Sequence, residues 1–582
     1  MAAFSPPLLV PILAVLLATA ATTQCYADKH HGHAAKAALA PPATVRAICH
    51  TTPNPASCLA SAAVHLDAAH IAASSVAVTL LPANILSVLL ASLRGALTAV
   101  SSLSPVLSST LSAPPSPSST PLRRGAAQDC LELHAATLES LSRSTSLLTS
   151  PGESLPAVRA HLSAALTNKA TCLDGLAGAS GPRMDDLLSS LDDAYEHVSN
   201  SLSLVARRGA GGPASSSFQA TVAKIIHHNR RLLQDEEEED DDDNSGGGDD
   251  DNSGNDKDQN GNGDENGETV ITVAKDGSGN FRTVGEAVAA APSRSDARTV
   301  IKVKAGTYEE NVEVPADKTN IALAGEGRDV TVITGSRSAA DGWTTFRTAT
   351  FGVSGEGFLA RDIAFRNTAG AARGQAVALR VNADMAAVYR CAVEGHQDSL
   401  YAHSFRQFYR ECAVSGTVDV VFGNAAAVLQ ACALVAGAPV PGQSNVLTAH
   451  SRSDPAQDTG FAVHSCTVEA SPELLGSGVS TRTFLGRPWG AYARSVVIES
   501  HLGPLVDRAG WTGWPGAEVG RSETVYFGEY GNDGPGAGTD GRVGWAGFHE
   551  MEYDEAAQFA VDKFIYGDDW LGATSFPYDD GI

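Results

Sequence analysis

The second half of the chain repeats short apolar segments at a nearly constant interval. Similar segment ends occur at AFRN 364–367, VYRC 388–391, YREC 409–412, LQAC 429–432 and VHSC 463–466. The residue numbers of successive segments differ by 24, 21, 20 and 34. A repeat of roughly 20 residues, with one insertion, is typical of a solenoid built from strands. This spacing predicts an all-β parallel β-helix over residues 269–582.

An antiparallel β-sandwich is the alternative fold for the same segments. Such a sandwich favours two-residue Asn-Gly and Asp-Gly hairpin turns, and these turns are scarce between the repeated segments. The parallel β-helix is therefore the better interpretation.

The repeat also predicts which residues lie one above another. Side chains one repeat apart would lie on neighbouring strands, roughly 4.8 Å from each other. The residue numbers of Asp398 and Asp419 differ by 21, and those of Gln375 and Gln397 differ by 22. Cys391 and Cys412 also differ by 21, which would place them on neighbouring coils within disulfide reach. The spacing therefore predicts a ladder of two amides and two carboxylates.

Two carboxylates at this separation cannot both ionise cheaply. One keeps a proton near neutral pH, and a neighbouring cation can keep the other charged, which yields an acid paired with a nucleophile or base. The alternative is that Asp398 and Asp419 only turn the chain between strands, where aspartate is common. Their register with two amides, inside apolar strand sequence, favours a catalytic pair.

The first half of the chain has a helical pattern. Over residues 43–206, apolar positions recur three and four residues apart, as in LPANILSVLLASLRGALTAV. The pattern is broken at proline-rich and glycine-rich stretches such as SAPPSPSSTP, residues 112–121. Four or more helices with short loops predict an all-α, up-and-down four-helix bundle.

Most of the net charge of -25 comes from one segment between the halves. Residues 235–268 carry 17 acidic side chains and one basic side chain. Such a segment cannot bury a core, so it is interpreted as a disordered acidic linker within the connecting residues 207–268. The sequence contains no basic patch with interleaved aromatic residues, which is the pattern that would indicate nucleic-acid binding.

The N-terminus and the cysteines indicate secretion. The apolar run LLVPILAVLLATA ends in Ala18-Thr19-Ala20, so residues 1–20 are interpreted as a signal peptide, with no membrane span in the mature form. Cys25 is left over, and four cysteines fall on each side of the acidic segment, as disulfides in an oxidising compartment require. A zinc site is the alternative, but no C-x2-C spacing supports it. The eight cysteines are Cys49, Cys58, Cys130, Cys172, Cys391, Cys412, Cys432 and Cys466.

Residues 269–567 resemble plant pectin methylesterases. The motifs that carry the resemblance, in order, are GTYEE (306–310), FLARDIAFRNTAG (358–370), QAVAL (375–379), GHQDSLYAHSFRQFY (395–409), GTVDVVFG (416–423) and LGRPWG (485–490). The resemblance implies a right-handed parallel β-helix that hydrolyses the methyl esters of cell-wall homogalacturonan. The products would be methanol and de-esterified pectin, and neither a metal nor an organic cofactor is implied.

The resemblance also implies roles for individual residues. Asp419 would attack the ester carbonyl, and Asp398 would protonate the departing methanol and then act as base on water. Gln397 and Gln375 would donate hydrogen bonds to the oxyanion. Arg487 would hold Asp419 ionised.

Substrate binding is implied for four residues, namely Gln375, Arg487, Trp489 and Thr307. Trp489 offers a flat face for a sugar ring, and a buried core position is its alternative. The chain departs from the usual family pattern at Ser399, His396, Val420 and Gly490. His396 places a titratable ring beside the expected acid.

The N-terminal half is similar to pectin methylesterase inhibitor bundles, through its cysteine spacing and the stretch VRAICHTTPNPASC. This resemblance implies disulfides Cys49–Cys58 and Cys130–Cys172, and a pro-region that either inhibits the enzyme or aids folding and sorting. The stretch RRLL (Arg230, Arg231, Leu232, Leu233) resembles a site cut by subtilisin-like proteases. The expected protein is secreted to the extracellular cell wall as a monomer, with methylesterified pectin, a processing protease and a proteinaceous inhibitor as partners.

Two other functions remain open at this point. A lyase or polygalacturonase with the same fold would shorten the polymer, whereas an esterase releases methanol from intact chains. An inhibitor or wall-binding protein with an inert β-helix would be unaffected by Asp419→Ala.

Overall fold

The computed structural model describes residues 43–75, 81, 83–112, 122–150, 154–180, 182–206, 269–478, 480–516 and 521–582. Residues Pro42–Ile582 form one compact unit that contains a helical half and a β half. The predicted signal peptide, Cys25, the RRLL stretch and the acidic segment lie outside the described residues.

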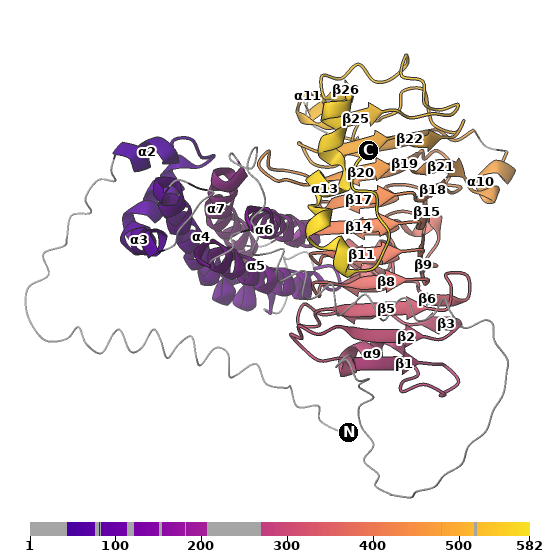
Figure 1. Ribbon diagram of the computed structural model, residues 1–582, viewed down its shortest axis with the longest axis horizontal. Helices are drawn as coiled ribbons and strands as arrows, with labels where there is room; N and C mark the ends of the chain where they lie inside the picture. The colour runs from indigo at the N-terminus through magenta and orange to yellow at the C-terminus, as the bar shows by residue number, and fades with distance from the viewer. Residues whose placement is uncertain are drawn as a thin grey trace, which may run out of the picture. The chain divides into compact units, whose positions relative to one another are not determined.

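Six helices make up the described part of the N-terminal half (Figure 1). They are α2 (Ala43–Cys49), α3 (Pro55–Ser75), α4 (Ala83–Leu111), α5 (Ala126–Thr149), α6 (Leu155–Leu176) and α7 (Pro182–Ala206). Helix α5 packs against α6, and α4 packs against α7 and α3. The predicted four-helix bundle is therefore confirmed, with α2 and α3 as an N-terminal hairpin.

Leucine side chains on the inner faces of these helices form the core of the bundle. Leu89, Leu141, Leu162 and Leu202 are completely buried. Each contributes about 1.5–3 kcal/mol relative to an exposed position. Helix α4 is long and apolar enough to cross a membrane by length and composition, but two-thirds of its most apolar stretch is buried in the protein.

Both predicted disulfides of the bundle are present. Cys49–Cys58 closes the α2–α3 hairpin, and Cys130–Cys172 joins α5 to α6. These bonds fix the two hairpins that the helical pattern alone would leave free to splay.

The C-terminal half is a parallel β-helix with three sheets (Figure 1), which confirms the predicted fold. The 11-stranded sheet contains β1 (Thr269–Val273), β2 (Thr299–Val303), β5 (Ile321–Gly325), β8 (Leu359–Arg361), β11 (Ala386–Tyr389), β14 (Arg406–Arg410), β17 (Ala426–Gln430), β20 (Gly460–His464), β23 (Arg494–Ile498), β25 (Tyr526–Tyr530) and β26 (Phe548–Glu550). The seven-stranded sheet contains β4 (Val312–Val314), β7 (Phe351–Val353), β10 (Leu379–Val381), β13 (Leu400–Ala402), β16 (Val421–Gly423), β19 (Asn445–His450) and β22 (Thr483–Pro488). The eight-stranded sheet contains β3 (Gly306–Glu309), β6 (Thr331–Gly335), β9 (Ala364–Asn367), β12 (Ala392–Glu394), β15 (Ala413–Gly416), β18 (Ala433–Ala436), β21 (Thr467–Ala470) and β24 (His501–Leu502).

Short helices lie between and after the strands of the β-helix. They are α9 (Val284–Ala290), η1 (Ala339–Asp341), η2 (Thr345–Thr348), η3 (Ala371–Arg373), α10 (Pro472–Gly476), α11 (Arg521–Thr524), α12 (Tyr553–Ala556), η4 (Ala557–Phe559), α13 (Val561–Phe564), η5 (Gly567–Asp569) and η6 (Leu571–Ala573). The C-terminal group from α12 to η6 includes Phe559, Phe564 and Trp570, which pack against outward-facing residues of the 11-stranded sheet such as Phe408.

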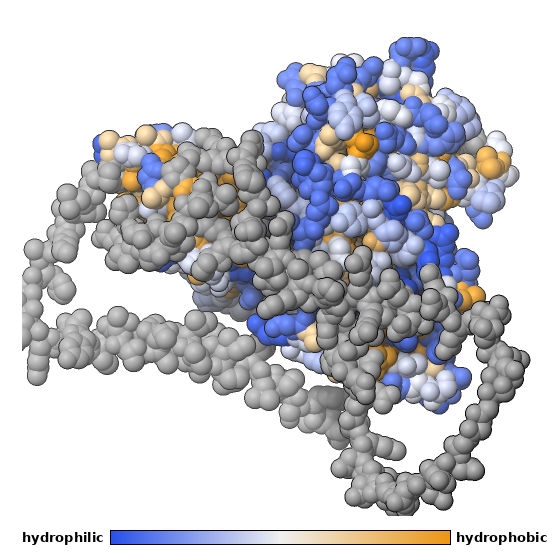
Figure 2. All heavy atoms as spheres, in the orientation of Figure 1, coloured by the Kyte–Doolittle hydropathy of each residue, from blue (hydrophilic) through white to orange (hydrophobic). Residues whose placement is uncertain are grey.

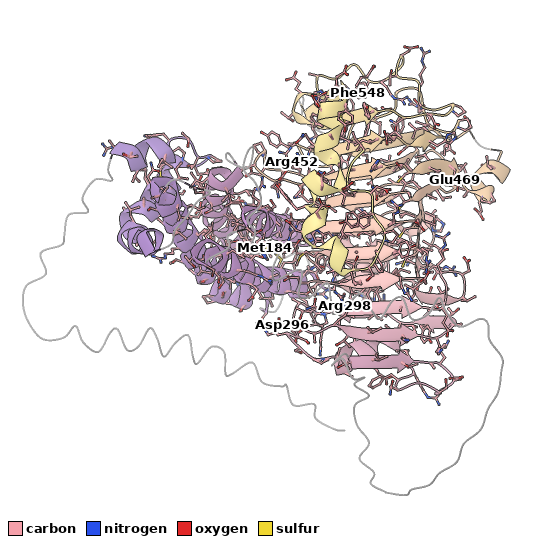
Figure 3. The ribbon with its side chains drawn as sticks, viewed as in Figure 1. Met184, Asp296, Arg298, Arg452, Glu469 and Phe548 are labelled. Carbon is pink, nitrogen blue, oxygen red and sulfur yellow. A yellow bond between two sulfur atoms is a disulfide. The ribbon has the colours of Figure 1, made fainter. Side chains whose placement is uncertain are left out.

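Apolar side chains fill the inside of the coils in vertical stacks. Leu379, Leu400 and Val421 lie directly above one another on β10, β13 and β16. Hydrophilic side chains cover most of the visible outer face of the β-helix (Figure 2). Arg452, in the loop after β19, and Glu469 of β21 lie on opposite sides of the β-helix (Figure 3).

The structure confirms three of the four predicted offsets. Val388 pairs with Tyr409, Phe408 with Val428, and Val428 with Ala462, so the paired residue numbers differ by 21, 20 and 34. The offset of 24 is wrong, because AFRN 364–367 belongs to the eight-stranded sheet and VYRC 388–391 to the 11-stranded sheet.

The true offset of that coil is 28, since Ala364 pairs with Ala392. The longer coil accommodates the turn η3 (Ala371–Arg373). Similar sequence at the end of two different strands concealed this difference.

The prediction that Cys391, Cys412, Cys432 and Cys466 form disulfides is wrong, because all four are buried free thiols. They lie at the same corner of successive coils, where Cys412 N–H points to Cys432 Sγ at 3.4 Å and Cys432 N–H to Cys466 Sγ at 3.3 Å. In-register side chains of parallel strands lie about 4.8 Å apart and point the same way, whereas a disulfide needs Cβ atoms about 3.8 Å apart. Cys432 and Cys466 instead each place a polarisable sulfur near the buried N–H of the cysteine one coil earlier, and the Ser500 hydroxyl oxygen accepts from Cys466 N–H at 3.0 Å.

Candidate active site

The two predicted aspartates lie one coil apart at the edge of the seven-stranded sheet. Asp398 precedes β13 and Asp419 precedes β16 by the same number of residues, and Leu400 pairs with Val421 between those strands. Both aspartates adopt the left-handed region, with φ of 65° and 54°, and their exposed fractions are 5% and 4%. Arg390, Glu411 and Ala431 adopt the same region, so this conformation is a feature of the β-helix turns and not of the site alone.

Arg487 makes the two carboxyl groups unequal. From β22 its Nε donates to Asp419 Oδ1 at 2.7 Å and its Nη2 to Oδ2 at 2.5 Å. Burial and the neighbouring Asp419 raise the pKa of Asp398 well above its ordinary value. Burial also raises the pKa of Asp419, but the Arg487 guanidinium opposes that rise. Of the two carboxyls, Asp398 therefore holds its proton to the higher pH, and Asp419 ionises first.

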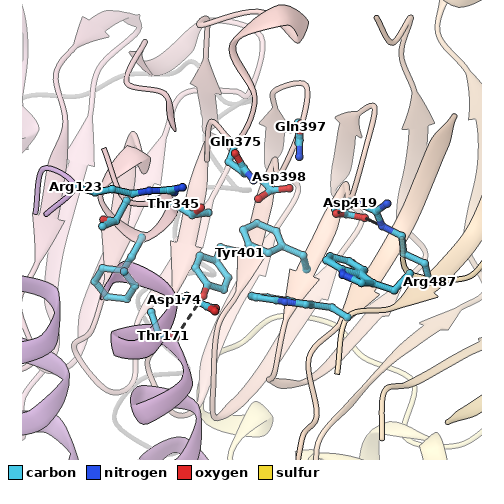
Figure 4. Close-up of a pocket in the computed structure, with 17 residues that line it drawn as sticks. Arg123, Thr171, Asp174, Thr345, Gln375, Gln397, Asp398, Tyr401, Asp419 and Arg487 are labelled. Carbon is cyan, nitrogen blue, oxygen red and sulfur yellow. Dashed lines mark hydrogen bonds and ion pairs between the residues drawn. The ribbon is translucent and has the colours of Figure 1, made fainter. Parts of the chain in front are cut away.

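Both predicted amides line the same cavity as the aspartates (Figure 4). Gln375 and Gln397 lie on neighbouring coils, since Ala376 N–H donates to the carbonyl oxygen of Gln397 at 3.1 Å. The cavity has a volume of about 250 Å³. Its amide N–H groups are donors within a space large enough for a small ester group.

Aromatic rings form one wall of this cavity. Tyr401 stacks on Phe422 with centroids 4.1 Å apart, and Trp489 stacks on Trp514 at 6.2 Å. The Arg487 guanidinium carbon lies 4.4 Å from the centre of the Trp514 ring. Trp489 is half-buried and lines the cavity, so the alternative of a core tryptophan is not what the structure shows.

Sequence reasoning missed three of these rings. Tyr401 pairs with Phe422 on the next coil, so the spacing that linked the aspartates could also have found these two rings. Trp514 has no such signal, because it lies in a loop after the last strand of the seven-stranded sheet.

The bundle also contributes to the cavity, which sequence reasoning did not predict. Arg123, Thr171 and Asp174 line it together with the catalytic candidates (Figure 4). Thr171 Oγ1 lies 2.9 Å from His403 Nε2 of the β-helix. Burial raises the pKa of Asp174 to about 6. Asp174 is nonetheless an exposed residue that lines the cavity, so solvent reaches its carboxylate.

Three other residues singled out from the sequence have different outcomes. Thr307 is exposed on β3, in the eight-stranded sheet, and does not line the cavity, so its role in substrate binding stays a prediction. His396 is half-buried, and burial lowers its pKa, so the ring is neutral at pH 7. A Cβ at Gly490 would lie 2.2 Å from the carbonyl oxygen of Arg452, so only glycine fits there.

Within the described ranges, no group of three or more His, Cys, Asp or Glu side chains is arranged to hold a metal ion.

Comparisons with known proteins agree with this geometry. The family model described as pectinesterase matches residues 270–568, and the one described as plant invertase/pectin methylesterase inhibitor matches residues 43–204. The probable pectinesterase/pectinesterase inhibitor 12 of Arabidopsis thaliana is 45% identical over 537 residues, which cover 92% of this chain and 93% of the relative. Pectinesterase 2.1 of Solanum lycopersicum is 42% identical over 466 residues, 79% of this chain and 78% of the relative.

A solved structure covers the β half alone. The pectin methylesterase from carrot is 50% identical with a TM-score of 0.53, and the match spans 54% of this chain and 98% of the carrot chain. The carrot protein therefore consists almost entirely of the β-helix. On these grounds the chain belongs to the pectinesterase family, as a pectinesterase that carries an inhibitor-like helical domain at its N-terminus.

Proposed function

We propose that the chain hydrolyses the methyl esters of pectin with Asp419 as nucleophile and Asp398 as acid and base. One observation carries this proposal: two buried carboxyls lie one coil apart, and only Asp419 is bound by a guanidinium. That arrangement supplies an ionised nucleophile and a protonated acid in the same cavity at the same pH.

The first half of the reaction forms an acyl-enzyme. An ionised oxygen of Asp419 attacks the ester carbonyl carbon, and the carbonyl oxygen becomes an oxyanion that accepts hydrogen bonds from the amides of Gln375 and Gln397. Each such donor is commonly worth about 3 kcal/mol of transition-state stabilisation. Asp398 gives its proton to the departing methoxy oxygen, methanol leaves, and an anhydride joins Asp419 to the galacturonate.

The second half restores the enzyme. Asp398 is now a carboxylate and takes a proton from water, and the resulting hydroxide oxygen attacks the galacturonate carbonyl of the anhydride. The anhydride bond breaks, Asp419 leaves as a carboxylate beside Arg487, and the substrate unit leaves as a free acid. The same two side chains are then ready in their starting protonation states.

Asp419→Ala tests this assignment. In the 269–582 chain, which corresponds to the solved carrot enzyme, we expect kcat for methanol release to fall by at least about a thousandfold. Asp362→Asn is the matched control, because Asp362 also has a positive φ of 56° and a bidentate partner, Arg390, but lies outside the cavity. If Asp419→Ala kept a tenth of the activity, Asp419 would not be the nucleophile.

Chain length separates this function from a lyase or a polygalacturonase. We expect methanol to appear while the size distribution of the pectin stays unchanged. Shortened or unsaturated products without methanol would favour the other two activities.

We further propose that the helical bundle inhibits the β-helix in the intact chain. Support comes from the bundle side chains that line the cavity and from hydrogen bonds between the halves. Asn424 donates to Thr167 Oγ1 at 2.9 Å, and Gln457 donates to the carbonyl oxygen of Ser163 at 3.1 Å. With bundle side chains beside Asp398 and Asp419, a polymer cannot enter the cavity and reach the two carboxyls. A role in folding or sorting is the alternative for the bundle.

A cut between the halves distinguishes these roles. With a specific protease site inserted within residues 207–268, we expect methanol release to rise at least about tenfold after cutting and dilution. Unchanged release after separation of the halves would favour the folding or sorting role.

We place this reaction in the plant cell wall, on methylesterified homogalacturonan. The proposal includes a secreted monomer whose signal peptide, residues 1–20, is removed and whose pro-region is cut at Arg230–Leu233 by a subtilisin-like protease. A separate proteinaceous inhibitor would bind the enzyme in the wall. Sequencing the N-terminus of the secreted protein tests the processing step, and a start elsewhere than just after Leu233 would overturn it.

A further inference from the structure

Arg347 forms a buried group of ion pairs between the bundle and the β-helix. Its Nε donates to Asp129 Oδ1 at 2.5 Å, its Nη2 donates to Glu132, and its Nη1 lies 3.5 Å from Glu313 Oε1. Thr344 also donates its hydroxyl to Asp129. Arg347 is 6% exposed and Asp129 is 1% exposed. This guanidinium is therefore fully occupied by carboxylates in the intact chain.

Two of the three carboxylates belong to the bundle. Asp129 and Glu132 lie on α5, whereas Glu313 lies on β4. Glu313 is already bound by Arg380, whose Nη2 lies 2.7 Å from Glu313 Oε2. Without the bundle, the β-helix has two guanidinium groups and one carboxylate at this place. A guanidinium that has lost two of its carboxylate partners keeps a donor geometry that matches another carboxylate.

Arg347 also lies next to the catalytic cavity. It belongs to η2, and its neighbours Thr344, Thr345 and Phe346 line the cavity with Gln375. Val377 N–H donates to Thr348 Oγ1 at 3.1 Å, so η2 lies on the coil next to that of Gln375. Arg347 itself does not line the cavity, but it follows directly after three residues that do.

We propose that Arg347 binds the free carboxylate of an already de-esterified galacturonate unit, and that Asp129 and Glu132 occupy this site in the intact chain. This inference rests on the proposed function, because it defines which pectin the same active site prefers. A guanidinium binds a carboxylate through two parallel hydrogen bonds, and the Thr344 hydroxyl supplies a third donor. The bundle carboxylates thus stand where substrate carboxylates bind.

The consequence concerns the order in which esters are removed. Each turnover converts a neutral ester into a carboxylate. If Arg347 binds that carboxylate, the next ester along the chain is held at the catalytic pair in preference to a distant one. The product would then contain contiguous de-esterified stretches.

Binding of an unesterified galacturonate oligomer tests the proposal without depending on catalysis. By calorimetry we expect the 269–582 chain to bind it at least about tenfold more tightly than the same chain with Arg347→Gln, since bonds to a charged group are lost. The full-length chain, whose site is occupied by α5, should bind as weakly as the variant. Equal affinity of the wild-type and Arg347→Gln 269–582 chains would overturn the proposal.

Matched variants separate carboxylate binding from a structural effect. Arg347→Lys keeps the charge and should recover part of the affinity, and Thr344→Val should lose part of it. Arg390→Gln removes a guanidinium that binds Asp362 outside the cavity and should change nothing. If Arg347→Gln unfolds the protein, the Thr344→Val variant decides, and unchanged affinity there would count against the site.

Kinetics separates failure of this inference from failure of the proposed function. On partly de-esterified pectin, kcat/KM of Arg347→Gln should fall at least about fivefold, and on fully esterified pectin it should stay within about twofold of wild type. An equal effect on both polymers would overturn the inference while methanol release still supports the esterase. If the wild-type chain released no methanol from any pectin, the proposed function would instead be overturned. The calorimetry would still test whether Arg347 binds the carboxylate.

Discussion

Asp419 and Asp398 have the same turn conformation and nearly the same burial. The difference between their pKa values therefore comes from one neighbour, Arg487. Arg487 contacts Asp419 through two hydrogen bonds, whereas burial and the Asp419 charge act together on Asp398. The pair shares its protons, so its titration belongs to both groups. The position of a single guanidinium therefore decides which carboxyl attacks and which donates a proton.

Arg487→Gln should move the acid limb of the pH profile to higher pH. Asp419 must be ionised to attack, and an adjacent Arg lowers a carboxyl pKa by roughly one to three units. Without that cation the pKa of Asp419 rises further, so kcat/KM falls at low pH and recovers as the pH rises. The measurement is methanol release across the pH range, with Arg487→Lys expected to shift the limb less. An acid limb that stays in place in Arg487→Gln would show that Arg487 does not set the charge of Asp419.

The coil spacing allowed the catalytic candidates to be predicted from the sequence, and it had clear limits. Asp398, Asp419, Gln375 and Gln397 were brought together by one period, since residues one coil apart must lie on neighbouring strands. Arg487 and Trp489 came from a motif on β22 and line the same cavity. Arg123, Thr171 and Asp174 were not found, because a contact between two separately folded halves leaves no period in either sequence.

At the scale of the elements, the same period gave one right and one wrong conclusion. It placed Cys391 below Cys412 correctly, but two side chains stacked in a parallel sheet point the same way and stay too far apart for a disulfide. The first coil was misjudged because AFRN 364–367 ends like the later segments but belongs to another sheet. Period alone fixes the distance between coils, and it leaves the sheet and the side-chain direction undetermined.

The four stacked free cysteines, Cys391, Cys412, Cys432 and Cys466, should react with an alkylating reagent only after the chain is unfolded. Burial raises the pKa of the Cys391, Cys412 and Cys432 thiols well above the ordinary value, so they should not react in the folded 269–582 chain. Unfolded in denaturant without a reductant, that chain should take up one alkyl group on each of its four cysteines. Mass spectrometry measures the added groups. Fewer than four additions would show that a disulfide is present.

At the scale of the whole molecule, the interface between the halves contains ionisable groups whose pKa values are shifted in opposite directions. Burial raises the pKa of Asp174 to about 6, and it lowers the pKa of His161 on the same helix to about 4. Asp174 therefore takes up a proton when the halves associate, and His161 gives one up. The pH dependence of association in the wild-type chain is the sum of these effects, so the contribution of one group needs a matched variant.

Asp174→Asn isolates that contribution. Above pH 6 the wild-type carboxylate must stay ionised where neighbouring protein removes part of its hydration, which weakens association, whereas the amide carries no such cost; below about pH 3 both side chains are neutral in both states. After a cut within residues 207–268, the dissociation constant of the variant should therefore be lower than that of wild type at pH 7 and equal to it at about pH 3. The difference at pH 7 is at most about a hundredfold, and smaller because Asp174 contacts the water of the cavity. Comparison at each pH cancels the titration of His161, which both proteins share. The concentration dependence of methanol release gives both constants, and a ratio that does not change with pH would show that Asp174 stays ionised when the halves are joined.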